Sequence, residues 1–348
     1  MRGCQQKGFV LVSVLWVLVI MVLAASAFSI WVDRVREQAS LRQQHAETYR
    51  RSTDALTKVV YTYITGIKTS DGVAWPGSNG AKTEVKFDSL DDFMAGAAAK
   101  VTASSAGFLR LDGTVFDIGD GIRIMVQDRG GLIGLSFLAN KTVFNSLAMH
   151  SGNHVTGERL ADTLLDYQDA DGVRRAQGAE EHDYIRASLP PPMNGYLRSP
   201  LQLRSIIDWD VALKDRDDAW ILRVFKSEGD AVINANTAYA GALQLVLNNE
   251  QNVQSVLDGR EPNPYSRASD LVKFTGGSED LLLSIIPAAG FRFWWWHQGD
   301  TAAYVYDVQF SPLDSGVNAW YFNWTARVTL PDDLAKSTAK TIDHPFFR

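Results

Sequence analysis

The fold is decided by one stretch near the start of the chain, Lys7-Gly8-Phe9-Val10-Leu11-Val12-Ser13-Val14-Leu15-Trp16-Val17. From here the chain carries no formal charge over residues 9–32, which is 24 residues. That length crosses a hydrocarbon core of about 30 Å at about 1.5 Å per residue. The short segment before it is basic, with Arg2 and Lys7, and basic flanks stay cytoplasmic. The sequence therefore predicts one membrane helix with the bulk of the chain on the outer side.

Three interpretations of this N-terminus stay open at this point. Ala25-Ser26-Ala27 resembles the cleavage site of a secretory signal peptide, but the apolar segment exceeds the usual 7–15 residues of such signals. A plain membrane anchor is the second interpretation. The third is a prepilin-like signal, in which the basic leader ends at Gly8 and cleavage exposes a hydrophobic residue, Phe9.

The continuation of the helix favours the third interpretation. No Pro or Gly occurs in residues 9–65, and residues 33–42 are rich in helix formers. Leu56, Val59, Val60 and Tyr63 then recur at helical spacing. We expect one helix of over fifty residues, half in lipid and half amphipathic. A pilin-type subunit needs such an outer half to pack on a globular head, whereas a signal peptide does not.

The rest of the chain contains two kinds of residue pattern, one typical of strands and one typical of helices. Apolar and polar residues alternate, or β-branched and aromatic residues gather, in the runs expected as strands at 107–111, 114–118, 121–128, 132–138, 291–296, 302–310 and 320–330. Helical patterns with Ser, Thr or Asp at N-cap positions fill most of residues 140–287. A further short helix is expected at 91–102. The predicted fold class is α+β, with a long N-terminal helix packed on an antiparallel sheet and a large helical domain inserted between strands.

These strand-like and helix-like patterns give the expected domain boundaries. The leader is 1–8, the long helix 9–65, the α+β domain 66–139 together with 288–335, the inserted helical domain 140–287, and a loose tail 336–348.

Composition excludes several classes of function. The net charge is −6 and no basic stripe occurs, so we expect no nucleic acid as a partner. The one cysteine is Cys4, so removal of the leader would leave no thiol for disulfides or zinc. His150 and His154 have the spacing of some metal ligands, but Gly152 lies between them and no third ligand is near. No catalytic arrangement can be defended, and we expect a protein that is not an enzyme.

Four parts of the chain resemble the minor pseudopilin protein K family of the type II (general) secretion pathway. They are the helix start at 7–17, the strand-and-turn segment 126–135, the acidic series 160–171 with 178–184 and 198–204, and the segment 232–238. The Asp-x-Asp and Gly-Ala-Glu motifs of the third part are the most specific. One departure is that Gly134 and Ser136 stand where the family usually carries asparagines.

The resemblance implies a structural role. It implies insertion in the inner membrane as a single-pass protein with a periplasmic head, cleavage after Gly8 by the prepilin peptidase, and N-methylation of Phe9. It further implies assembly with minor pseudopilins I and J at the tip of a pseudopilus that takes part in export of folded proteins. Direct contact with the secreted proteins stays open. The alternatives are a minor pilin of a type IV pilus, or a periplasmic protein released by signal peptidase.

The fifth residue of the expected mature chain is Ser13. Pilin-like helices usually carry a glutamate there, which pairs with the N-terminal amine of a neighbouring subunit. An unpaired carboxylate in lipid is costly. The resemblance implies that a subunit without this carboxylate starts a fibre, although a small residue tolerated in a membrane helix is the simpler explanation of Ser13.

An acidic loop is the candidate metal site. Five carboxylates crowd into residues 169–183: Asp169, Asp171, Glu180, Glu181 and Asp183. Clustered carboxylates without His or Cys suit Ca²⁺, and a solvated acidic loop is the alternative. The spacing is not that of an EF-hand. The resemblance implies structural calcium in this loop. Asp166 is either a further ligand or helix surface.

The triplet Trp294-Trp295-Trp296 is unusual. On a strand, Trp294 and Trp296 point to one face and Trp295 to the other. Core packing and an exposed indole used in subunit contacts are both open from sequence.

Overall fold

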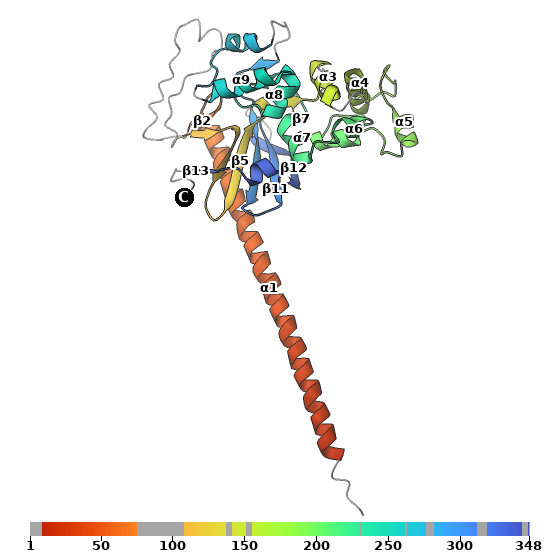
Figure 1. The fold of residues 1–348 in the computed structure, drawn as a ribbon, viewed down its shortest axis with the longest axis vertical. Coiled ribbons are helices and arrows are strands. Elements are labelled where there is room, and N and C mark those ends of the chain that lie inside the picture. Colours follow the sequence, from red (N-terminus) through yellow and green to blue (C-terminus); the bar gives the residue numbers. More distant parts are fainter. Residues whose placement is uncertain are drawn as a thin grey trace, which may run out of the picture. The chain divides into compact units, whose positions relative to one another are not determined.

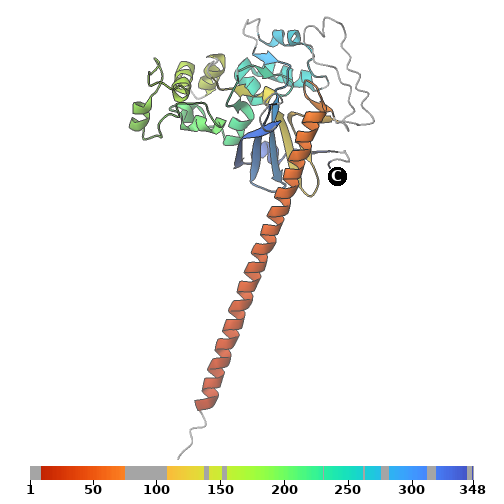
Figure 2. The same ribbon diagram turned by 180° about the vertical axis from the view of Figure 1, so that it is seen from behind.

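The computed structural model describes residues 9–74, 108–136, 141–150, 155–229, 231–261, 263–275, 282–311, 319–342 and 347. The expected leader 1–8, the short helix expected at 91–102 and His154 lie outside these residues. The chain divides into two compact units, Met1–Asp54 and Ala55–Arg348, and the second is called the head below. Figures 1 and 2 show the chain from opposite sides.

The first element is a single helix, α1 (Phe9–Thr65), of 57 residues (Figure 1). This confirms the prediction of one uninterrupted helix of over fifty residues. Its residues 11–30 are all exposed to solvent. In the described part of the chain, α1 is the one helix long and apolar enough to cross a membrane. It ends at Thr65, and the next residue, Gly66, lies so close to Val73 and Ala74 that a side chain has no room.

The head is built on a six-stranded sheet with the order β12-β11-β10-β5-β4-β13. Its neighbours pair antiparallel, except that β13 runs parallel to β4. This confirms the predicted α+β class with an antiparallel sheet. The strands are β4 (Asp112–Asp117), β5 (Ile122–Asp128), β10 (Gly290–His297), β11 (Ala302–Phe310), β12 (Trp320–Thr329) and β13 (Lys340–Thr341). A smaller sheet joins β1 (Ile67–Lys68), β2 (Gly72–Ala74) and β3 (Phe108–Arg110).

The last three turns of α1 pack against one face of the large sheet. Tyr63 is the central contact: its ring stacks on Phe310 with 4.6 Å between ring centroids. Its hydroxyl donates a hydrogen bond to the Ala288 carbonyl and accepts one from the Gly290 amide at 3.2 Å. The four residues that recur at helical spacing in the sequence, Leu56, Val59, Val60 and Tyr63, are all buried in this contact, and Ala55 is buried with them.

Between the two groups of sheet strands the chain is mostly helical, but the domain expected to be all-helical also contains short strands. The elements are α3 (Lys141–His150), α4 (Gly157–Gln168), α5 (Glu181–Arg186), η3 (Pro200–Ser205), α6 (Trp209–Ala212), α7 (Asp218–Val224), α8 (Ala240–Leu247), α9 (Glu250–Arg260) and η4 (Ala268–Phe274). Short strands β6 (Ile133–Gly134), β7 (Phe225–Lys226), β8 (Ile233–Asn234) and β9 (Leu283–Ser284) pair β6 with β7 and β8 with β9.

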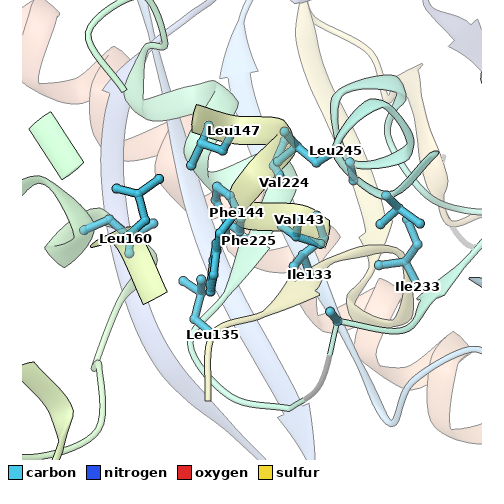
Figure 3. Close-up of a cluster of buried hydrophobic side chains, with 14 of the residues drawn as sticks. Ile133, Leu135, Val143, Phe144, Leu147, Leu160, Val224, Phe225, Ile233 and Leu245 are labelled. Carbon is cyan, nitrogen blue, oxygen red and sulfur yellow. The ribbon is translucent and has the colours of Figure 1, made fainter. Parts of the chain in front are cut away.

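This helical region has its own hydrophobic core. Figure 3 shows Phe144 and Leu147 of α3 next to Val224 and Phe225. The same region also contacts the sheet, because Leu222 of α7 packs on the sheet face opposite α1.

Three details differ from the expectations. The tryptophans alternate between faces as predicted, but all three are buried, which rules out an exposed indole: Trp294 and Trp296 pack in the core with α7, and Trp295 packs on the face that α1 covers. Residues 137 and 138 of the expected strand 132–138 lie outside the described residues, and its described part forms only β6, which follows a 3₁₀ turn (Arg129–Gly131) and pairs with β7. The expected loose tail is wrong at β13, which pairs with β4.

Candidate functional site

Two features carry the functional expectations: the apolar half of α1 and the acidic loop. Phe9 is the first residue of α1, and Gly8 lies outside the described residues. Ser13, the fifth residue after the expected cleavage point, lies on the exposed surface of the helix within its first two turns. The geometry thus places an uncharged residue where pilin-like helices usually carry a glutamate.

The acidic loop begins where α4 ends and closes at the start of α5. Thr156 caps α4 by accepting a hydrogen bond from the Arg159 amide at 3.1 Å. The Arg159 guanidinium then donates to the carbonyls of Gln177 at 2.6 Å and Gly178 at 2.8 Å. Asp162 accepts a hydrogen bond from the Gln177 amide at 2.8 Å. The C-terminal part of the loop, at Gln177 and Gly178, is therefore held against α4, where the loop begins.

The structure brings three of the five predicted carboxylates together. One oxygen each from Asp169, Asp171 and Glu180 lies within 4.8 Å of the other two. Asp169 Oδ1 and Glu180 Oε1 are buried and have no hydrogen-bond partner among the described residues. Since a buried carboxylate oxygen without a partner is costly, this pair of oxygens marks the position where a cation would be most stabilising.

The other two predicted residues point elsewhere. Glu181 is exposed on the first turn of α5. Asp183 accepts a hydrogen bond from the Glu180 amide at 3.2 Å and lies 3.7 Å from Arg174 and 3.9 Å from Arg186. Its carboxylate is therefore engaged in capping α5 and in pairing with arginines.

Sequence reasoning missed the role of Arg175. Its guanidinium donates to Asp166 Oδ1 at 2.5 Å and also to Asp169 Oδ2, while its amide donates to Asp166 Oδ2 at 3.1 Å. Asp166 is fully buried, so it is not helix surface. Arg175 is nine residues from Asp166 in the sequence, and the acidic composition around it gave no signal that one arginine would neutralise both aspartates.

Among the three clustered carboxylates, Glu180 has a strongly raised pKa. Burial, followed by the negative charges of Asp166, Asp169 and Asp171, raises the pKa of Glu180 to about 7. The attraction of Arg175 opposes this rise without cancelling it. The surroundings of Glu180 therefore disfavour its charged form, and Arg175 alone does not offset the charges of the neighbouring carboxylates.

A pH dependence of stability follows from the raised pKa of Glu180. The folded protein holds this proton up to about pH 7, whereas an unfolded glutamate releases it near pH 4.3. Between these values the folded state binds more protons, so its stability falls as the pH rises. In calcium-free buffer we expect Glu180→Gln to reduce the drop in thermal midpoint between pH 5.5 and 7.5. Glu181→Gln should keep the wild-type drop, and equal drops in all three proteins would refute the assignment.

The donor set fits a hard cation. Calcium takes 6–8 oxygen ligands at about 2.3–2.6 Å, so oxygens on opposite sides of the ion lie about 5 Å apart. The three carboxylates match that spread. Asp169, Asp171 and Glu180 are thus the residues that would hold the ion, with carbonyls and water completing its shell.

The comparisons with known proteins give a likeness to solved structures only. No protein-family profile matches the chain, and no curated protein sequence matches it. Among solved structures, the chain is similar to a chain of the GspK-GspI-GspJ complex from the enterotoxigenic Escherichia coli type 2 secretion system. The identity is 14%, the TM-score is 0.44, and the match covers 62% of this chain and 82% of that one.

Proposed function

We propose that this protein is a minor pseudopilin that occupies the tip of a type II secretion pseudopilus and takes part in export of folded proteins. It is inserted in the inner membrane by α1, processed by prepilin peptidase before Phe9, and joined to minor pseudopilins I and J. In this proposal its role is structural, and it performs no catalysis.

The observation that carries the proposal is α1 itself. One helix combines a membrane-length apolar segment with a C-terminal end that forms part of the head's core. A cleaved secretory signal has no use for this continuity, because removal after Ala27 would discard the apolar segment and leave a bare helix. A subunit that is anchored by its helix and assembled through it needs both parts.

The position at the tip rests on Ser13. In a fibre of pilin-like subunits, a carboxylate at the fifth position of one helix would pair with the N-terminal amine of the next. Ser13 has no charge to offer, so this subunit has no such link to a subunit above it. Its own N-terminal amine remains able to pair with a neighbour's carboxylate, which suits the first position of a fibre.

We further propose that Asp169, Asp171 and Glu180 bind a structural Ca²⁺. The support comes from the two buried oxygens that have no hydrogen-bond partner in the described part of the chain, and from the raised pKa of Glu180. The ion would neutralise the charges of these carboxylates and hold the loop against α4, where ordering the loop backbone costs about 1–2 kcal/mol per residue.

The mature N-terminus tests the proposed function. Intact-mass and N-terminal peptide analysis of the protein from membranes should show a chain that begins at Phe9 and carries one added methyl group. A chain that begins at Phe28 would identify a secreted periplasmic protein and overturn the proposal. A minor pilin of a type IV pilus would also begin at Phe9, so co-purification with pseudopilins I and J is the second arm that separates these two.

A further inference from the structure

The outer edge of the large sheet is the long strand β12. β12 has ten residues and pairs with β11 on one side only. It contains no Pro and no Lys, two residues that usually protect an edge from pairing with another chain. Its own protective features are the charge of Arg327 and a register shift opposite Asp307 and Val308. Among the described residues, no further strand pairs with its free side. Figure 1 shows β12 next to β11 in the head.

The register identifies which backbone groups are free. Leu330 donates its amide to the Thr301 carbonyl at 2.9 Å, directly opposite, and the register continues as Ala302↔Thr329 and Ala303↔Val328. Opposite residues of an antiparallel pair alternate between hydrogen-bonded and non-hydrogen-bonded pairs. The amides and carbonyls of Ala326 and Val328 therefore face β11. Those of the alternate residues face away from the sheet: Thr325, Arg327 and Thr329.

The side chains along this edge define the chemistry of a partner. Phe322 is 42% exposed and packs on Tyr306 with 5.5 Å between ring centroids, so one end of the edge is apolar. Arg327 is exposed at the other end, where the Tyr304 ring lies 5.8 Å from its guanidinium. No carboxylate of the described residues pairs with Arg327. The edge thus fits an extended strand with an apolar residue beside Phe322 and an acidic residue beside Arg327.

A second copy of this chain does not meet these requirements at the same edge. The residues of β12 are Trp-Tyr-Phe-Asn-Trp-Thr-Ala-Arg-Val-Thr, with no Asp or Glu. Whatever register two copies of β12 adopt, Arg327 finds no carboxylate on the opposite strand. The partner is therefore a different chain.

We propose that β12 is the docking edge for a strand of a neighbouring minor pseudopilin, which extends the six-stranded sheet across the subunit boundary. This rests on the proposed function, since it takes the neighbour to be another pilin-like subunit. The neighbour's strand satisfies the outward backbone groups of Thr325, Arg327 and Thr329 and supplies a carboxylate to Arg327. Main-chain bonds give the contact its strength, and the flanking side chains give it specificity.

The test uses the full-length protein in detergent with co-expressed pseudopilins I and J. Amide hydrogen exchange, resolved to single residues, should show Thr325, Arg327 and Thr329 exchanging at least tenfold more slowly in the complex than in the free chain. Ala326 and Val328 should be protected in both states. Proline tests the same point by mutation, because an edge strand tolerates it where the amide faces away from the sheet.

Thr325→Pro should keep the thermal midpoint of the free chain and weaken the complex at least tenfold. Ala326→Pro is the matched variant: it removes an amide that faces β11, so it should lower the thermal midpoint. Arg327→Glu should weaken the complex without changing the fold, and Arg327→Lys should restore most of the affinity. These two variants keep the test decisive if the proline variants fold poorly.

The outcomes separate the two proposals. If the complex forms but the three amides stay unprotected, the edge proposal is overturned and the proposed function stands. If I and J do not bind the wild-type chain at all, the proposed function fails and the docking edge fails with it. Protection that appears in the free chain as its concentration rises would identify a second copy as the occupant and overturn the choice of partner.

Discussion

Asp307→Ala should destabilise the head by about 3–5 kcal/mol, because it leaves a buried arginine without its counter-ion. Asp307 Oδ2 accepts hydrogen bonds from Arg292 Nη2 at 2.6 Å and Nε at 3.0 Å. The two side chains are 1% and 0% exposed. In a unit of this size, a loss of 1 kcal/mol lowers the thermal midpoint by about 2–4 °C. The expected fall is therefore on the order of 10 °C.

The pair matters because it joins the sheet to the helical region. Arg292 lies on β10 and Asp307 on β11, and the same guanidinium donates to the carbonyls of Leu222 and Phe225 at the end of α7. The Trp324 ring lies 4.7 Å from it. Asp307 also accepts a hydrogen bond from Asn323 at 2.7 Å. Loss of the carboxylate therefore weakens the sheet and its contact with α7 together.

A matched surface pair controls for the loss of an acidic charge. Asp333 lies 2.6 Å from Arg223, and its side chain is 53% exposed. Exposed ion pairs contribute about 0–1 kcal/mol, so Asp333→Ala should shift the midpoint by no more than a few degrees. Thermal unfolding of both full-length variants, followed by near-UV circular dichroism, measures the difference. Equal shifts for the two variants would show that Asp307 is not the counter-ion on which Arg292 depends.

The sequence predicted those helices and strands that can be recognised from the pattern of their own residues. The long helix follows from an uncharged run and a stretch without Pro or Gly, and its buried residues follow from their spacing. The alternation in residues 122–128 and 291–296 predicted strands β5 and β10, and it placed Trp295 on the face opposite Trp294.

Elements decided by distant partners could not be predicted in this way. β6 has only two residues because its partner, β7, follows α7 about ninety residues later. The tail at Lys340 is ordered by pairing with β4, which no property of its own sequence indicates. In the acidic loop, composition placed five carboxylates together, but the backbone path decides that Asp183 caps α5 and that Arg175 reaches Asp166.

The second large effect concerns calcium. In wild-type protein, saturating Ca²⁺ should raise the thermal midpoint of the head, since a ligand at 100 times its Kd stabilises by about 2.7 kcal/mol. We expect a rise on the order of 5–10 °C over the value in EGTA. The double variant Asp169→Asn with Glu180→Gln should lose this response, because it removes the negative charges of the two carboxylates whose buried oxygens would bind the ion. Mg²⁺, which requires a smaller octahedral shell, should give a weaker response in the wild type.

In EGTA, the double variant can be more or less stable than the wild type, and this difference distinguishes a cation site from an acidic loop that binds no metal. Without metal, Glu180 is buried among the negative charges of Asp166, Asp169 and Asp171, which raises its pKa to about 7. The double variant removes the charges of Asp169 and Glu180 and so relieves this repulsion, and at pH 8 in EGTA it should be more stable than the wild type.

A control removes the same number of charges from exposed positions, Glu181→Gln with Asp210→Asn. This control should keep both the wild-type calcium response and the wild-type stability in EGTA.

If instead the double variant of Asp169 and Glu180 responds to calcium as the wild type does, these residues do not bind the ion. A double variant that is less stable than the wild type in EGTA would show that the two carboxylates serve mainly as acceptors for Arg175 and the surrounding backbone. The loop would then be held by its own ion pair, and no metal would be needed to explain its order.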